Sequence, residues 1–258
     1  MKSAALRVVE SHVESSLAGR VLSPFTVREP RAPDTLPTGV PAVDALTGGL
    51  PRSALTEIFG PASSGRTSLL LSILAEVTLR KEVCALVDAS DAFDPGSAAA
   101  AGADLKRLLW VRCGTRETRN EKRETFKRVE QALKATDLLL QAGGFGLVVV
   151  DLADIPPAVA RRVPLASWFR FRRAVENTST ALLVIEQQPY AQTCASLVLR
   201  MQRNTSGLSF HPAKNGVPTH ARLLRGISVS AEVVRSRLER KPVRAASANF
   251  ETRAAWAG

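Results

Sequence analysis

Eight consecutive residues in the first third of the chain have the types and spacing of a phosphate-binding loop. They read Gly60-Pro61-Ala62-Ser63-Ser64-Gly65-Arg66-Thr67 and follow the pattern G-x-x-x-x-G-K-[ST], except that Arg66 replaces the lysine. Glycines let backbone N–H groups turn toward a phosphate, and the N-terminus of a following helix adds a favourable dipole. Arg66 keeps the positive charge, but a guanidinium is wider than an ammonium group and reaches around phosphates less well. The loop predicts weakened binding of ATP and Mg²⁺ through Gly60, Ser63, Ser64, Gly65, Arg66 and Thr67.

A carboxylate further along the chain could complete a Mg²⁺ site. Asp151 ends the apolar run Leu147–Asp151, which has the continuous hydrophobicity of a strand buried on both faces. An acid at the end of such a strand holds Mg²⁺ in phosphate-loop enzymes, together with the loop hydroxyl. Thr67 and Asp151 are therefore the expected Mg²⁺ ligands, and the alternative is an ordinary aspartate at a strand end.

The elements around these residues alternate between strand and helix patterns. Strands are predicted at 54–59, 83–88, 108–113, 146–151 and 180–186, and helices at 67–80, 96–102, 121–141 and 164–176. This alternation predicts an α/β fold with a mostly parallel sheet flanked by helices. Short alternating segments at 196–203, 221–224 and 227–237 predict antiparallel strands at one edge.

We expect three regions along the chain. Residues 1–35 contain an amphipathic helical pattern followed by a proline-rich arm. Residues 36–237 form the core with the phosphate loop. Residues 238–258 are basic, small and weakly periodic, which predicts a flexible tail.

Charge and composition exclude several classes of protein. The 258 residues carry a net charge of +11 with 45% hydrophobic residues, which excludes a mainly disordered chain. The three cysteines are far apart, which argues against a disulfide scaffold, and no apolar run reaches the roughly 18 residues of a membrane span. We therefore expect a cytoplasmic protein with no membrane partner.

The positive charge is concentrated in two segments. Residues 106–134 have 10 basic against 4 acidic residues, and residues 200–258 have 11 against 3. Such segments favour an acidic partner, either nucleic acid or an acidic protein surface, and the alternative is a set of solvated helix faces. The run Trp168-Phe169-Arg170-Phe171-Arg172-Arg173 interleaves aromatic residues with arginines and could bind nucleic acid, but packing of Trp168 and Phe171 in the core explains it better. Trp256 in the tail is a candidate docking anchor.

Several motifs resemble the core of bacterial RecA recombinases. They are Leu36-Pro37-Thr38-Gly39, the run from Val43 to Pro51, Glu57-Ile58-Phe59-Gly60-Pro61, Ala85-Leu86-Val87-Asp88-Ala89, Phe93-Asp94-Pro95 and Ile185-Glu186-Gln187. The resemblance covers roughly residues 36–250. It implies a RecA-like fold that binds ATP and Mg²⁺, with Gln187 linking the γ-phosphate to a DNA loop. It also implies that Arg235 and Arg237 reach a neighbouring subunit's phosphates and that the N-terminal segment docks onto the next protomer. An exposed basic strand explains the two arginines equally well.

The departures from this family point to lost catalysis. Ser90 stands where the family has the glutamate that activates water, and serine is a poor general base. Ser97 replaces a tyrosine that stacks on adenine, and the two DNA-binding loops are reduced. Asp91 or Asp94 could substitute for the glutamate, although Asp94 matches another family position. We therefore assign no catalytic residue and expect weak or absent ATPase activity.

This combination is similar to the ImuA group of RecA paralogues in bacterial mutagenesis cassettes. The similarity implies an accessory role in the SOS response to DNA damage, in translesion synthesis. The implied partners are an ImuB-like, Y-family-like polymerase-related protein and an error-prone polymerase. RecA, a second copy of the chain and DNA on the basic surfaces are further candidates. The alternatives are an active ATP-dependent DNA-binding recombinase-type ATPase and a regulator that uses the fold only as a scaffold.

Overall fold

The structure, a computed structural model, describes residues 34–114, 121–208, 226–237 and 247–253. The predicted N-terminal helix and arm before residue 34, the predicted strand at 221–224 and Trp256 all lie outside these residues. In the described residues none of the helices is long and apolar enough to cross a membrane.

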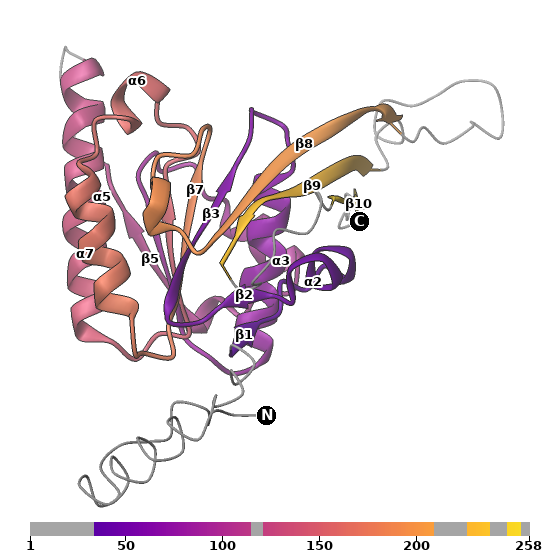
Figure 1. The fold of residues 1–258 in the computed structure, drawn as a ribbon, viewed down its shortest axis with the longest axis horizontal. Coiled ribbons are helices and arrows are strands. Elements are labelled where there is room, and N and C mark those ends of the chain that lie inside the picture. Colours follow the sequence, from indigo (N-terminus) through magenta and orange to yellow (C-terminus); the bar gives the residue numbers. More distant parts are fainter. Residues whose placement is uncertain (1–33, 115–120, 209–225, 238–246, 254–258) are drawn as a thin grey trace, which may run out of the picture. The chain divides into compact units, whose positions relative to one another are not determined.

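An eight-stranded sheet forms the centre of the described region, in the order β10-β9-β8-β3-β7-β6-β4-β5 (Figure 1). Its parallel strands are β3 (Ala54–Phe59), β4 (Cys84–Asp88), β5 (Leu108–Arg112), β6 (Leu147–Asp151) and β7 (Ala181–Glu186), and β8 (Leu197–Leu208) pairs in parallel with β3. The antiparallel strands β9 (Gly226–Ser236) and β10 (Ser247–Arg253) extend the sheet beyond β8. A separate antiparallel pair joins β1 (Thr35–Leu36) to β2 (Leu50–Pro51). The predicted α/β fold with antiparallel strands at one edge is confirmed.

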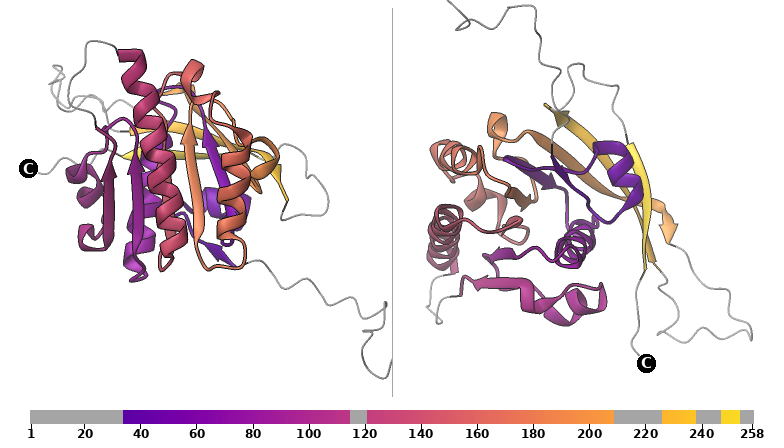
Figure 2. Two further views of the ribbon diagram at one scale, coloured as in Figure 1. Left: turned by 90° about the vertical axis from the view of Figure 1, so that its left-hand side faces the viewer. Right: turned by 90° about the horizontal axis from the view of Figure 1, so that it is seen from below.

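Helices cover both faces of this sheet (Figure 2). On one face lie α2 (Pro41–Thr47), α3 (Arg66–Leu79) and α4 (Pro95–Ala100), with the 3₁₀ helix η1 (Leu105–Arg107) leading into β5. On the other lie α5 (Glu121–Ala142), α6 (Pro157–Ala160) and α7 (Leu165–Val175), and the 3₁₀ helix η2 (Gln192–Cys194) precedes β8. Each face has its own apolar core because the central strands are buried on both sides.

Trp168 belongs to the second of these cores. Its side chain is fully buried, and its ring meets that of Phe171 edge-on with centroids 6.0 Å apart. This confirms core packing as the better explanation of the aromatic and arginine cluster on α7. The cysteines at 84, 113 and 194 are free and buried, in agreement with the absence of a disulfide scaffold.

The prediction of a flexible tail at 238–258 is wrong for its middle part, because residues 247–253 form β10. Phe250 pairs with Val229 in the register with β9 and is partly buried against the core. Seven residues with an apolar side chain at alternate positions suffice to add a strand when a long partner strand is present. The tail composition alone does not contain the information about that partner.

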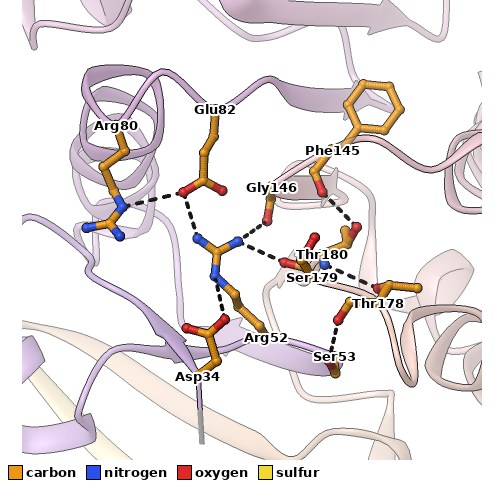
Figure 3. Close-up of polar contacts among 10 residues, drawn as sticks. All are labelled: Asp34, Arg52, Ser53, Arg80, Glu82, Phe145, Gly146, Thr178, Ser179 and Thr180. Atoms are coloured by element: carbon orange, nitrogen blue, oxygen red, sulfur yellow. Dashed lines mark hydrogen bonds and ion pairs between the residues drawn. The ribbon is translucent and has the colours of Figure 1, made fainter.

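Arg52 lies at the end of the sheet opposite the phosphate loop and ties several strands together (Figure 3). Its side chain is 8% exposed, and its Nη2 lies 2.7 Å from Glu82 Oε1. Nη1 donates to the carbonyl oxygens of Ser179 at 2.8 Å and Gly146 at 3.4 Å, while Nε lies 3.7 Å from Asp34. This arginine therefore joins the segments that precede β4, β6 and β7 to the start of β3.

Candidate nucleotide site

The predicted phosphate loop connects β3 to α3, as the sequence indicates. Ser63 (φ 60°) and Gly65 (φ 88°) both adopt left-handed backbone conformations, and Gly65 is the N-cap of α3. Left-handed residues within such a turn let successive backbone N–H groups converge on an anion. The backbone of the loop therefore fits a phosphate group.

Both glycines of the loop are required by close packing from strands far along the sequence. A Cβ on Gly60 would lie 2.3 Å from the carbonyl oxygen of Met201 in β8. A Cβ on Gly65 would lie 2.7 Å from Cγ2 of Val229 in β9, a residue that is fully buried. Strands β8 and β9 thus pack directly against the phosphate loop and leave no room for larger residues there.

Arg66 is directed into the protein, where its guanidinium is bound. The residue is 6% exposed, and its Nη1 donates a hydrogen bond of 2.6 Å to the carbonyl oxygen of Glu186 at the end of β7. Burial lowers the pKa of Arg66, and the charges of Asp151 and Asp154 partly offset this. The cation of the loop is therefore bound to the sheet in this state, whereas Thr67 in the next position is exposed.

The predicted Mg²⁺ carboxylate lies on the neighbouring strand. Asp151 ends β6, and its Oδ1 accepts a hydrogen bond of 2.9 Å from the N–H of Ala153. Burial raises the pKa of Asp151 to about 6, and the nearby Asp88 and Asp154 add to the effect. In the described residues no group of three or more His, Cys, Asp or Glu side chains could hold a metal ion. A Mg²⁺ ion here would need nucleotide oxygens to complete its shell.

Gln187 follows β7 and contacts the segment after β6. Its Nε2 donates to the carbonyl oxygens of Ala153 at 3.0 Å and Ile155 at 3.4 Å. The side chain therefore links the ends of the adjacent strands β6 and β7. Asp151 is the last residue of β6, and Glu186 is the last residue of β7.

The turn after β4 holds the position at which the family resemblance places the water-activating acid. Ser90 occupies it, and its Oγ is buried without a hydrogen-bond partner among the described residues. Asp88 organises this turn by accepting hydrogen bonds from the N–H groups of Ser90, Ala92 and Phe93 and from the indole N–H of Trp110. Asp88 thus serves the local fold.

The other two acids of this turn are also engaged. Asp91 forms a two-point ion pair with Arg112, with Oδ1–Nε 2.6 Å and Oδ2–Nη2 2.7 Å. Asp94 caps α4 by accepting hydrogen bonds from the N–H groups of Gly96 and Ser97 and from the Ser97 hydroxyl. Neither carboxylate has the freedom of an unpartnered general base.

A cavity of about 740 Å³ opens beside the phosphate loop. It is bounded by α2, α3, α4 and β10, and the small residues Ser97, Ala100 and Ala101 line one wall. Phe250 is the aromatic residue among its lining residues. Ser68, the neighbour of Thr67 on α3, is the lining residue nearest to the loop in the sequence, and the loop residues themselves do not line the cavity.

The segment 187–196 after β7 is short and bound to the core. The buried carboxylates of Glu57 in β3 and Glu186 in β7 accept hydrogen bonds from its backbone N–H groups. Arg237 donates to the carbonyl oxygen of Thr193 at 2.7 Å, and Arg235 lies near Glu57. Arg235 and Arg237 therefore face segment 187–196. Of the other predicted site residues, the structure brings four to one edge of the sheet, namely Gly60, Arg66, Asp151 and Gln187.

Sequence reasoning quoted Glu57 and Glu186 only as parts of motifs and missed their pairing. A signal was present, because a charged residue within a continuous apolar strand of a parallel sheet is rare unless it has a partner. The partner itself could be identified only from the register of β3 and β7. The ion pair between Asp91 and Arg112 was missed for a similar reason, because only the pairing of strands brings the two residues together.

A phosphate loop between a strand and a helix, at the carboxyl ends of parallel strands, is the arrangement that defines the P-loop fold class. Residues 6–164 match the family model described as the RecA N-terminal domain. The chain is 30% identical to Protein RecA of Rhizobium leguminosarum bv. viciae over 203 residues, which cover 72% of this chain and 54% of the relative. It is 31% identical to Protein RecA of Aquifex aeolicus (strain VF5) over 202 residues, 72% of this chain and 55% of the relative.

The chain belongs to the RecA family. It spans about half the length of the curated relatives it matches.

Proposed function

We propose that this protein is a RecA-family accessory protein of DNA-damage-induced translesion synthesis that acts through protein contacts and hydrolyses ATP weakly or not at all. The observation that carries the proposal is the turn after β4. Ser90 occupies the general-base position there, and the acids at 88, 91 and 94 are all engaged in hydrogen bonds or an ion pair. A general base must be free to accept the proton of the attacking water, so hydrolysis lacks its usual acceptor.

ATP and Mg²⁺ remain candidate ligands of the loop. The loop backbone at Gly60, Ser63, Ser64 and Gly65 would hold the phosphates, with Thr67, Asp151 and Gln187 beside them. A bound Mg²⁺ would neutralise phosphate charge. Arg66 would first have to give up its hydrogen bond to the Glu186 carbonyl oxygen, which costs binding free energy. Nucleotide binding would therefore be weaker than in a loop whose cation is free.

Partners are proposed from the charge distribution and the reduced loops. The resemblance to the ImuA group favours an ImuB-like protein and an error-prone polymerase as the contacts of the basic surfaces. Exposed basic side chains on α5, such as Lys127 and Lys134, are suited to an acidic protein surface or DNA. Self-association or docking onto RecA would use the N-terminal segment and Arg235 and Arg237.

A recombinase-type ATPase is the second candidate function. It is favoured by the kept residues Thr67, Asp151 and Gln187, by the cavity beside the loop, and by the names of the relatives. In that case a displaced carboxylate, such as Asp91 released from Arg112, would accept the proton.

The deciding experiment compares ATP hydrolysis by the wild type and Ser90→Glu, each with and without single-stranded DNA. We expect little turnover by the wild type and a rise toward the roughly 100-fold that a general base contributes in Ser90→Glu. Ala99→Glu, which adds the same charge at an exposed position of α4 that does not line the cavity, is the matched control and should stay at the wild-type level. DNA-stimulated turnover by the wild type, unchanged in Ser90→Glu, would establish the recombinase-type alternative.

A further inference from the structure

Two glutamates are diagonal neighbours toward the carboxyl ends of two central strands of the sheet. Glu57 and Glu186 are on the adjacent parallel strands β3 and β7, and both are 0% exposed. Because Phe59 pairs with Glu186 and side chains alternate along a strand, both carboxyl groups lie on the face that carries segment 187–196. Two neighbouring carboxylates in a buried site cannot both be ionised without a large cost in free energy.

The hydrogen bonds to this pair come from one short stretch of backbone. Oε1 of Glu57 accepts from the N–H of Tyr190 at 2.6 Å and of Ala191 at 2.8 Å. Oε2 of Glu186 accepts from the same Tyr190 N–H at 3.2 Å. The remaining oxygens, Oε2 of Glu57 and Oε1 of Glu186, are buried without another partner among the described residues. A proton between the two carboxyl groups would satisfy them.

Among the described residues, no charged group near the pair neutralises the two carboxylates in place of this proton. From β9, Arg235 contributes only a charge effect on Glu57, and from α3, Arg66 binds the backbone carbonyl oxygen of Glu186 rather than its carboxylate. Tyr190 and Cys194 face the pair from segment 187–196 and η2. Among the described residues, therefore, no cation forms an ion pair with either carboxylate.

The proton is expected on Glu186. Burial and the charge of Glu57 raise the pKa of Glu186 well above its ordinary value. Burial also raises the pKa of Glu57, but the N–H groups of Ala191 and Tyr190 stabilise its ionised form. Glu186 can then donate to an ionised Glu57, which in turn accepts two backbone hydrogen bonds.

We propose that a proton shared by Glu57 and Glu186 holds segment 187–196 against the sheet, and that loss of this proton releases the segment. With the proton in place the pair carries one negative charge, matched by the two N–H groups. Without it the pair carries two charges that repel each other in a buried site. The device does not depend on nucleotide binding, so it can succeed or fail independently of the function proposed above.

The direction of the pH effect follows from the raised pKa of Glu186. A group whose pKa is higher in the folded state stabilises that state at low pH, and the stabilisation is lost as pH rises through the folded-state pKa. Segment 187–196 should therefore be closed at acidic pH and should open as pH rises.

Hydrogen exchange of the backbone N–H groups of Tyr190 and Ala191 tests this, expressed as protection relative to the intrinsic exchange rate at each pH. In the wild type, protection should fall at least tenfold between about pH 5 and pH 10, while Val184 within β7 stays protected. In Glu186→Gln the amide donates permanently to Glu57, so protection should change less than twofold. The same tenfold fall in both proteins, or in neither, would overturn the proposal.

Further measurements keep the test informative. Glu176→Gln removes an exposed carboxylate at the end of α7 and should follow the wild-type pH profile. Glu57→Gln removes the ionised acceptor and should lower protection of Tyr190 and Ala191 already at pH 5. If Glu186→Gln does not fold, ¹³C NMR of glutamate-labelled wild type replaces it. A carboxyl titrating well above the ordinary glutamate pKa supports the proposal, and only ordinary titrations contradict it.

Discussion

At the scale of single residues, the candidate site differs from an ordinary phosphate loop because its charged side chains are bound to other groups of the protein. The guanidinium of Arg66 lies against the end of β7, and Asp91 is occupied by Arg112. Asp151 remains beside the loop with a raised pKa. In the described structure, therefore, the charged side chains at 66 and 91 are both bound to protein groups rather than free to contact a ligand.

The raised pKa of Asp151 predicts a pH-dependent gain in stability when the charge is removed. The folded-state pKa of about 6 exceeds the ordinary value of 3.8, so the ionised form destabilises the fold as pH rises through about 6. Asp151→Asn should therefore be more stable than the wild type at pH 7.5, by up to about 3 kcal/mol from the pKa difference. Near pH 3, below the ordinary pKa, the two proteins should be equally stable. Urea unfolding at the two pH values measures this, and a gain that is the same at both would contradict it.

At the scale of elements, the phosphate loop depends on β9 as much as on its own sequence. Gly65→Ala places a Cβ 2.7 Å from Val229 Cγ2. It also forces alanine into the left-handed backbone conformation that Gly65 adopts, which is strained for any residue with a Cβ. Gly48→Ala is the matched control, since Gly48 is also left-handed (φ 72°) but has nothing within 4 Å. We expect Gly48→Ala to cost about 1–2 kcal/mol of unfolding free energy from backbone strain, and Gly65→Ala to cost about 1–3 kcal/mol more from the steric clash.

A double-mutant cycle assigns the excess to the contact with β9. Val229→Ala removes the clashing methyl groups, so in the Gly65→Ala background it should cost much less than in the wild type. Thermal or urea unfolding of the four proteins gives the coupling. Strictly additive effects would show that β9 does not press on the loop.

Substitution of Arg52 tests how much its contacts stabilise the end of the sheet that lies opposite the phosphate loop. Arg52→Ala leaves Glu82 and two backbone carbonyl groups without their donor, and should lower the unfolding free energy by about 2–4 kcal/mol at neutral pH. Arg80→Ala also removes a contact to Glu82, but Arg80 is 45% exposed, so its loss should cost about 0–1 kcal/mol.

The pH dependence of the Arg52→Ala effect is fixed by Glu82. Burial acts to raise the pKa of Glu82, but the hydrogen bond and charge of Arg52 outweigh it and lower the pKa. A lowered pKa gives stability that is lost as pH falls through the folded-state value. The difference between the wild type and Arg52→Ala should therefore shrink in acid. A difference that does not change with pH would mean that the carbonyl hydrogen bonds, and not the ion pair, carry the effect.

At the scale of the whole chain, the sequence predicted what depends on local pattern and missed what depends on distant partners. The alternation of apolar strands with amphipathic helices placed β3 to β7, α3, α4, α5 and α7 within one or two residues of their bounds, whereas the short helix α6 was not predicted. The phosphate loop was predictable for the same reason. The hydrogen bond from Arg66 to Glu186 joins residues 120 positions apart, and no local pattern encodes it. The strand β10 was missed because its basic, small-residue surroundings resemble a tail.

The final prediction concerns whether β10 is part of the cooperative core. Phe250 and its neighbour Glu251 both line the cavity, but Phe250 is partly buried against the core whereas Glu251 is exposed. Phe250→Ala removes a large apolar side chain and should lower the unfolding free energy by about 1–3 kcal/mol, less than for a fully buried phenylalanine. Glu251→Ala should stay within about 0.5 kcal/mol. Urea unfolding measures both. If the two substitutions cost the same, β10 only lies on the surface of β9 and the wall of the cavity is not a fixed part of the fold. A selective loss in Phe250→Ala shows instead that β10 unfolds together with the core against which Phe250 packs.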